Sequence, residues 1–254
     1  MLRQRGSPVY PVLSRFSPLL LLAAWEAASR AGLLDQRFFS APSRIAASFG
    51  ELLASGELVL NCAVSLWRIA AGFLLGAVPG VAVGLTMGLF PVVRAFLEPS
   101  MAAVFPIPKL AILPLILLIF GIGEASKIVI IAIGVFFLVM FNSMAGVVNI
   151  DRIYLDVARN HGAGRKDFYF TVALPGALPM VFTGFKLGMG TALLLIVAAE
   201  FVGARSGVGF MIWESWDMFD IERMFAGLIT VSGIGYVTSA CLDRLERLVI
   251  PWKA

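Results

Sequence analysis

The feature that most constrains this chain is a series of apolar segments, each about as long as a membrane is thick. A helix needs about 20 predominantly apolar residues to cross the ~30 Å hydrocarbon core of a bilayer. The clearest apolar segments lie at 61–90, 92–120, 128–150, 177–201 and 224–242. A weaker run at 18–31 is interrupted by Glu26, and a full span there would extend over 12–33. The sequence therefore predicts an all-α membrane protein with six transmembrane helices.

Composition agrees with this class. Hydrophobic residues make up 59% of the chain and charged residues only 14%, whereas a soluble domain carries roughly 25% charged residues. The net charge of +4 does not indicate nucleic-acid binding, because the Lys and Arg residues lie mainly in loops beside the spans. Cys62 and Cys241 are far apart in apolar surroundings, where a cysteine is usually a small buried hydrophobe. We expect membrane lipid as a partner and no nucleic acid.

The basic residues also predict the orientation of the spans. With both termini in the cytoplasm, eleven Lys and Arg residues fall on the inner side, six on the outer side and three within spans. Cytoplasmic loops carry an excess of Lys and Arg. We therefore expect a multi-pass protein with cytoplasmic N- and C-termini, and the polar segment 151–175 in the cytoplasm.

Glycines in the second span predict close helix packing. They recur every four residues, at Gly72, Gly76, Gly80, Gly84 and Gly88. This spacing leaves a groove of bare backbone along one ridge of a helix, where a neighbouring helix approaches closely. The fifth span repeats the spacing with Gly184, Gly188 and Ala192.

Prolines in the third span predict a break. Pro106, Pro108 and Pro114 punctuate the apolar segment 92–120, and each proline removes a backbone hydrogen-bond donor. Irregular backbone at membrane depth is tolerated only against protein or a water-filled cavity. This segment is therefore a candidate for lining a pathway.

The segment 151–175 separates the fourth and fifth spans and is strongly polar. Asp151 can cap a short helix, and Gly162 suits the left-handed residue that ends it. A second short helix is expected at 165–171, stopped by Leu174-Pro175 before the next span. The alternative is an ordinary loop, but loops are usually much shorter. We expect this segment to bind a cytoplasmic partner.

Seven residues of this segment correspond in spacing to a known signature. They are Asp156, Val157, Ala158, Gly162, Val172, Leu174 and Pro175. The pattern resembles the EAA signature of binding-protein-dependent ABC importer permeases, which reads Glu-Ala-Ala, then Gly, then Ile-x-Leu-Pro. The chain departs from that signature at Asp156, Val157 and Val172, each time by a mild substitution.

Other stretches resemble the branch of that family that imports nitrate, aliphatic sulfonates and taurine. These stretches lie at 65–68, 72–73, 106–111, 120–124 and 199–201. The resemblance runs from about residue 60 to residue 248. We therefore divide the chain into 1–60, an N-terminal arm with the first transmembrane helix and an external segment, and 61–250, a five-helix permease core.

The resemblance implies a type I ABC importer permease fold with a cytoplasmic coupling helix, in the inner membrane of a bacterium. It implies a second permease copy, most simply a homodimer, two cytoplasmic ATPase subunits that each receive one coupling helix, and an external binding protein that delivers the substrate. The residues expected at the ATPase contact are Asp156, Val157, Ala158, His161, Gly162, Ala163, Leu174 and Pro175. For His161 a plain contact role is favoured over a pH switch.

The sequence shows no ATP-binding or catalytic motif. No G-x-x-x-x-G-K-[ST] phosphate loop occurs in it, and no cluster of Asp, Glu, His or Cys has the spacing of a catalytic metal site. We expect a transport subunit that is not an enzyme and holds no cofactor of its own. ATP and Mg would be bound by the partner ATPase.

Five residues are candidates for the substrate pathway: Pro106, Pro108, Lys109, Asn142 and Glu200. A lysine at mid-helix costs roughly 2.5–3.5 kcal/mol on insertion scales. Lys109 is therefore either a cationic wall for an anionic substrate, or a lysine that snorkels or pairs with a neighbour such as Glu124.

The other charged and polar residues of the spans have simpler interpretations. Glu200 belongs to an external gate or pairs with Arg205, and the pair is favoured. Asn142 contacts substrate or bonds between helices, and the helix contact is favoured. Arg68 is expected to snorkel, and Lys186 to face cytoplasmic water.

Together these features predict a permease subunit of an ATP-driven importer for a small anion such as a sulfonate, taurine or nitrate. The alternative is an ion-coupled secondary transporter, which needs buried acids within its spans and usually internal repeats. Only Glu26 and Glu200 qualify, and neither is expected to lie deep. A membrane-embedded enzyme would need clustered nucleophiles, bases or metal ligands in the spans, and the sequence shows none.

Overall fold

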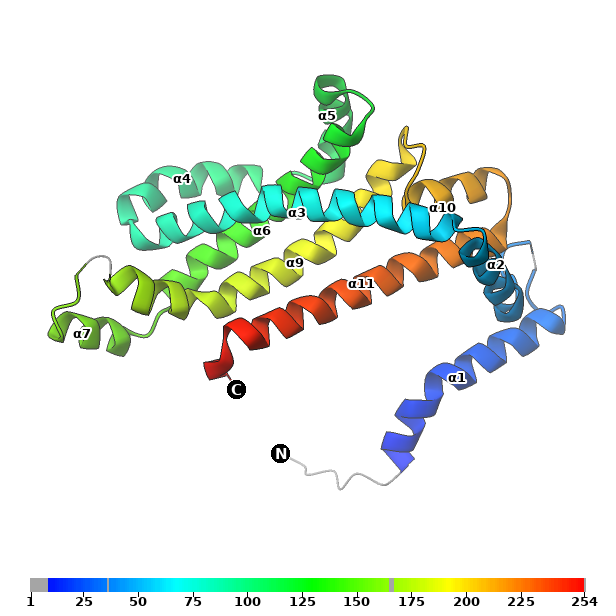
Figure 1. Cartoon of the computed structure of the whole chain (residues 1–254), viewed down its shortest axis with the longest axis horizontal. Helices are drawn as coiled ribbons and strands as arrows, with labels where there is room; N and C mark the ends of the chain where they lie inside the picture. Colours follow the sequence, from blue (N-terminus) through cyan, green and yellow to red (C-terminus); the bar gives the residue numbers. More distant parts are fainter. Residues whose placement is uncertain (1–8, 36, 165–166, 254) are drawn as a thin grey trace. The chain divides into compact units, whose positions relative to one another are not determined.

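A computed structural model of the chain describes residues 9–35, 37–164 and 167–253, and every regular element in these ranges is helical (Figure 1). The α-helices are α1 (Val9–Arg30), α2 (Pro42–Ala54), α3 (Glu57–Leu89), α4 (Pro91–Val104), α5 (Leu113–Phe120), α6 (Glu124–Val148), α7 (Arg152–Asn160), α9 (Leu174–Phe201), α10 (Val208–Asp217) and α11 (Ile221–Val249). The short helices are η1 (Lys109–Ile112), η2 (Phe168–Ala173) and η3 (Pro251–Lys253).

The chain forms two compact units. The smaller one comprises Met1–Val59 and Met211–Ile229, and the larger one comprises Leu60–Phe210 and Thr230–Ala254. In the smaller unit, Glu26 of α1 accepts hydrogen bonds from Arg30 and from the Ser43 hydroxyl at the start of α2. The division into 1–60 and 61–250 stays a prediction, because it rests on resemblance rather than compactness.

Four helices among the described residues are long and apolar enough to cross a membrane. They are α3, α6, the continuous helix Phe168–Phe201 and α11. A fifth span results if α4 and η1–α5 are counted as one broken span. Although α1 is 22 residues long, it is not among them, and Glu26 interrupts its apolar run. Six spans are thus not confirmed.

The glycine ridge of α3 packs against α6, as predicted. A Cβ atom added at Gly72 would lie 2.6 Å from the Cβ of Ile131, and one added at Gly84 would lie 2.8 Å from the Cβ of Ser143. Gly76 packs directly on the Ala132 carbonyl oxygen, which is a backbone atom. Close approach of this kind, rather than exclusion of water, drives helix association in a bilayer.

Helices α6 and α9 run side by side in Figure 1 and form the centre of the larger unit. Their shared core consists of fully buried aliphatic residues, among them Ile130, Val135, Val139, Ala192 and Ile196. The glycine spacing of the fifth span is confirmed as well, because Gly184 and Gly188 lie against Val139 and Val135 of α6.

The third span is broken, as its prolines predict. Helix α4 ends at Val104, η1 begins at Lys109, and the two parts of the span are bent by 83°. The second part is anchored by Leu113 and Ile116, which are buried in the core of the larger unit.

The polar segment folds partly as predicted. The Asp151 carboxylate accepts the Ile153 N–H at 3.1 Å and so caps α7, and Gly162 ends this helical segment at φ 69°. The predicted stop at Leu174-Pro175 is wrong, because a π-helical stretch over Phe168–Ala173 continues directly into α9. Pro175 has no N–H to donate, and the wider π turn before it, in which the Leu174 N–H reaches the Tyr169 carbonyl, accommodates that gap. Residues 165–166 of the predicted second helix lie outside the described residues.

Candidate functional site

Helix α7 lies between α6 and α9 in the chain (Figure 1), and it exposes an apolar side. Ile153, Tyr154 and Val157 are 61%, 64% and 51% exposed, whereas Ala158 is buried. A helix of nine residues is too short to cross a bilayer, and its neighbours in sequence are polar. The exposed apolar side of α7 is thus a surface available to a protein partner.

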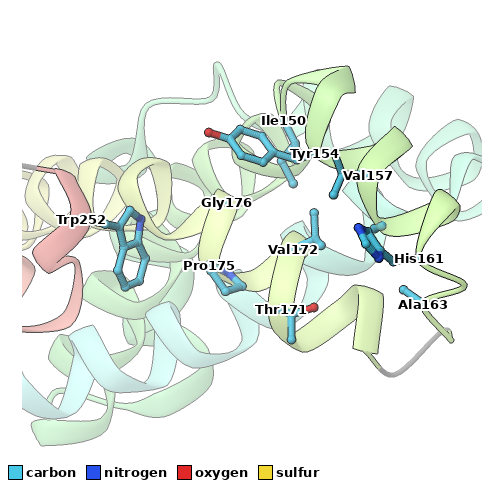
Figure 2. A pocket seen from close by; sticks show the side chains of 11 residues that line it. Ile150, Tyr154, Val157, His161, Ala163, Thr171, Val172, Pro175, Gly176 and Trp252 are labelled. Atoms are coloured by element: carbon cyan, nitrogen blue, oxygen red, sulfur yellow. The ribbon is translucent and has the colours of Figure 1, made fainter.

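A cavity of about 490 Å³ opens beside this helix (Figure 2). Its walls come from α7, from the π-helical stretch, from the first turn of α9 and from Trp252 in η3. Val157, Val172 and His161 lie together in Figure 2, and Trp252 lies apart from them beyond Pro175. The lining is predominantly apolar, which suits an apolar side chain of a partner.

The structure gathers most of the predicted coupling residues at this cavity. Its lining includes Val157, Ala158, His161, Ala163 and Pro175. A second cavity of about 580 Å³ on another side of the segment is again lined by Ala158 and Ala163, together with Phe168 and Tyr169. Asp156, Gly162 and Leu174 line neither of these two cavities.

The predicted pathway residue Glu200 lies in a partly buried ion cluster, which we call the far-end cluster because it lies at the ends of α6 and α9 opposite to α7. It consists of Arg68, Glu124, Glu200 and Ser65. The Arg68 guanidinium donates to Glu200 at 2.8 Å, and to both carboxylate oxygens of Glu124 at 2.5 and 2.7 Å. The side chains of Glu200 and Arg68 are 0% and 2% exposed, whereas that of Glu124 is 56% exposed.

Two predictions about this cluster are therefore wrong. Glu200 pairs with Arg68 rather than with Arg205, and Arg68 is buried rather than snorkelling. The physical reason is that a buried guanidinium needs carboxylates around it, and α6 and α9 supply one each. In the sequence, Arg68, Glu124 and Glu200 each lie near an end of an apolar segment, and this pattern could have predicted that they pair.

Lys109 lies at the bend of the broken span. Its ammonium group donates to the carbonyls of Phe105 and Ile107 at 2.7 and 2.9 Å, and lies 4.7 Å from the centre of the Phe137 ring. The pairing with Glu124 is not observed, since Glu124 binds Arg68. Lys109 therefore satisfies carbonyls at the break between α4 and η1, and a cation remains at the bend.

Two other polar residues of the spans have partners that differ from those expected. Asn142 donates to the Leu138 carbonyl of its own helix at 2.8 Å, so the expected hydrogen bond between helices is not observed. Lys186 forms ion pairs with Asp243 and Glu246 of α11 at 2.5 and 2.6 Å, and its side chain is 38% exposed. It thus joins α9 to α11 in addition to facing solvent.

No group of three or more His, Cys, Asp or Glu residues suited to holding a metal ion occurs within 9–35, 37–164 and 167–253. Apolar spans, a broken span and a short helix with an exposed apolar side define the class as a polytopic helical membrane protein.

Comparison with known proteins identifies the family. Residues 76–251 match the family described as binding-protein-dependent transport system inner membrane component, and the chain belongs to it. It is 35% identical over 236 residues to the putative aliphatic sulfonates transport permease protein SsuC of Bacillus subtilis, which covers 93% of this chain and 86% of that protein. It is 32% identical to the taurine transport system permease protein TauC of Escherichia coli, with 92% and 86% covered.

Two further comparisons agree. The nitrate import permease protein NrtB of Leptolyngbya laminosa is 32% identical, with 76% of this chain and 70% of that protein covered. The fold resembles a chain of the MetNI methionine ABC transporter with a TM-score of 0.56 at 22% identity, covering 74% of this chain and 91% of that one. This chain is thus an ABC importer permease of the inner membrane, and an ion-coupled secondary transporter is disfavoured.

Proposed function

We propose that this permease forms the pathway for a small organic sulfonate and is driven by an ATPase subunit that docks on α7. The substrate class is supported by the names of the relatives, two of which are sulfonate and taurine permeases covering more than nine tenths of this chain. A nitrate-like anion is the neighbouring alternative, because a nitrate permease is also similar.

The observation that carries the docking proposal is the exposed apolar side of α7 beside an apolar cavity. Val157 is half exposed, and it lines the cavity together with Ala158 and His161. An apolar surface outside the bilayer is stabilised when a protein partner covers it. The ATPase subunit would bind ATP and Mg, deliver its movement through α7, and receive contacts from Asp156, Gly162, Ala163, Leu174 and Pro175.

The remaining partners follow from the same proposal. A second copy of this chain completes the pathway, most simply as a homodimer, and an external binding protein delivers the substrate. Both termini lie in the cytoplasm, as the distribution of basic residues predicts. Pro106, Pro108, Lys109 and Asn142 are the proposed pathway residues, with the cation of Lys109 facing an anionic substrate from the bend. Glu200 acts on the pathway through the far-end cluster.

Uptake into proteoliposomes tests the substrate class. The permease, its ATPase subunit and its binding protein are reconstituted, and ATP-dependent uptake of labelled taurine is measured with unlabelled methanesulfonate or nitrate as competitor. We expect uptake that methanesulfonate suppresses and nitrate does not. Uptake suppressed only by nitrate, or no uptake of taurine while nitrate is transported, would contradict the sulfonate assignment.

A further inference from the structure

The far-end cluster contains more hydrogen bonds than an ion pair needs. The Glu200 carboxylate accepts from the Arg68 guanidinium, from the Ser65 hydroxyl at 2.8 Å and from the Gly209 N–H at 2.8 Å. A buried ion pair is weak evidence for stability, because removing two charges from water offsets most of their attraction. The number of hydrogen bonds in the cluster therefore points to a role beyond stability.

The cluster fastens the loop that follows α9 to one face of α3. The Ser206 carbonyl accepts from Arg68 at 2.7 Å, the Gly207 N–H donates to Asn61 at 2.8 Å, and the Val208 N–H donates to Ser65 at 2.9 Å. Positions 61, 65 and 68 lie on the same side of a helix. Residues 206–208 are thus all held by one side of α3, within two of its turns.

The loop closes over Glu200 without spare room. Gly207 has φ 115°, a conformation that favours glycine, and an added Cβ there would overlap the Glu200 carboxyl group. An added Cβ at Gly209 would lie 2.8 Å from the Cβ of Glu200. With Glu124 at the first residue of α6, the cluster ties together α3, α6, α9, the loop 202–207 and the start of α10.

We propose that the far-end cluster joins these ends of α3, α6 and α9, the loop 202–207 and the start of α10 into one rigid body, and that the contacts within this body stay formed while the pathway alternates. Arg68 is its positioning residue. The role in transport rests on the proposed function. Parting Arg68 from its carboxylates would leave buried charges without partners, which is strongly unfavourable. Movement during transport is therefore confined to other parts of the chain, and packed bodies of this kind move as units.

A cross-link across the contact tests whether it opens. Ser65→Cys and Val208→Cys are combined in a chain carrying Cys62→Ser and Cys241→Ser, and the pair is oxidised to a disulfide while the chain folds, because the folded protein shields both positions from reagents. In the reconstituted complex, ATP hydrolysis stimulated by the binding protein should stay within about twofold of the reduced protein, since a rigid body needs no internal movement. A loss of about tenfold that reduction reverses would overturn the proposal. Failure of the cross-link to form would also overturn it.

Thiol labelling tests the part of Arg68 without depending on transport, so it stands even if the substrate is another anion. The single cysteine of Val208→Cys should be protected, and adding Arg68→Met should raise its labelling rate by about tenfold or more, as local opening exposes it. Arg68→Lys should give partial protection. The matched control is Arg94→Met, which removes an exposed ion pair with Glu98 and should leave labelling unchanged. Equal labelling of the Arg68→Met and Arg94→Met chains would show that Arg68 positions nothing.

Discussion

Adding one methyl group at Gly76 should separate two central helices. The added carbon of Gly76→Ala would overlap the carbonyl oxygen of Ala132, and it would lie 3.0 Å from the carbonyl carbon and the Cα of the same residue. All three are backbone atoms, so no side-chain rotation relieves the overlap and α3 must move away from α6.

The two opposing effects can be estimated. Replacing glycine by alanine within a helix stabilises it by about 1 kcal/mol. Overpacking a close contact costs about 1–3 kcal/mol, and here the cost lies at the upper end because backbone must shift. The net expectation is a destabilisation of about 1–2 kcal/mol. For a chain of this size, 1 kcal/mol lowers the melting temperature by roughly 2–4 °C.

The assay is thermal unfolding of the purified permease in detergent, with Gly50→Ala as the matched control. Gly50 lies within α2, and an added Cβ there meets nothing within 4 Å. The same chemical change should therefore raise the melting temperature slightly at Gly50 and lower it at Gly76. If both variants melted at or above the temperature of the unchanged chain, the close contact between α3 and α6 would be refuted.

Three further predictions follow from single contacts. Gly162→Ala should destabilise the turn at the end of α7 by about 1–2 kcal/mol, because alanine is strained at φ 69°. Faster hydrogen exchange of the α7 amides would measure this loss. Lys186→Met should lower the free energy of unfolding by no more than about 1 kcal/mol, because the ion pair is partly exposed. The difference in stability between the variant and the unchanged chain should disappear at high salt, which screens the pair. A large loss would mean that the pair is better shielded than its exposure indicates. Lys109→Ala should impair uptake of an anion while assembly with the ATPase persists, and normal transport kinetics would remove its role as a cationic wall.

Local chemistry made much of the fold predictable from the sequence. The glycine spacing of α3 identified the face that meets α6, since bare backbone every four residues has no other use in a membrane helix. The prolines identified the break near Lys109, and Asp151 and Gly162 identified the ends of α7. Each of these signals acts within one or two helical turns.

The partners of charged residues could not be predicted in the same way. Arg68 and Glu200 are 132 positions apart, and periodicity gives the face of a residue but not the acid that meets it. Nearness in sequence favours Arg205 as the partner of Glu200, whereas the three-dimensional packing brings Arg68 to it. The continuation of the polar segment into α9 was missed because a π turn before Pro175 has no distinct sequence pattern.

The measurement that most directly tests the central claim is binding of the ATPase subunit to a permease altered on α7. Val157→Asp places a charge on the exposed apolar side, and Val92→Asp makes the same change at an exposed residue that lines neither cavity of the segment. Burying an unpaired carboxylate at a central contact should cost at least about 2 kcal/mol, or roughly 30-fold in affinity. The account predicts that Val157→Asp loses the ATPase on co-purification while Val92→Asp retains it, with both chains equally folded. Equal retention by the two variants would contradict docking on α7.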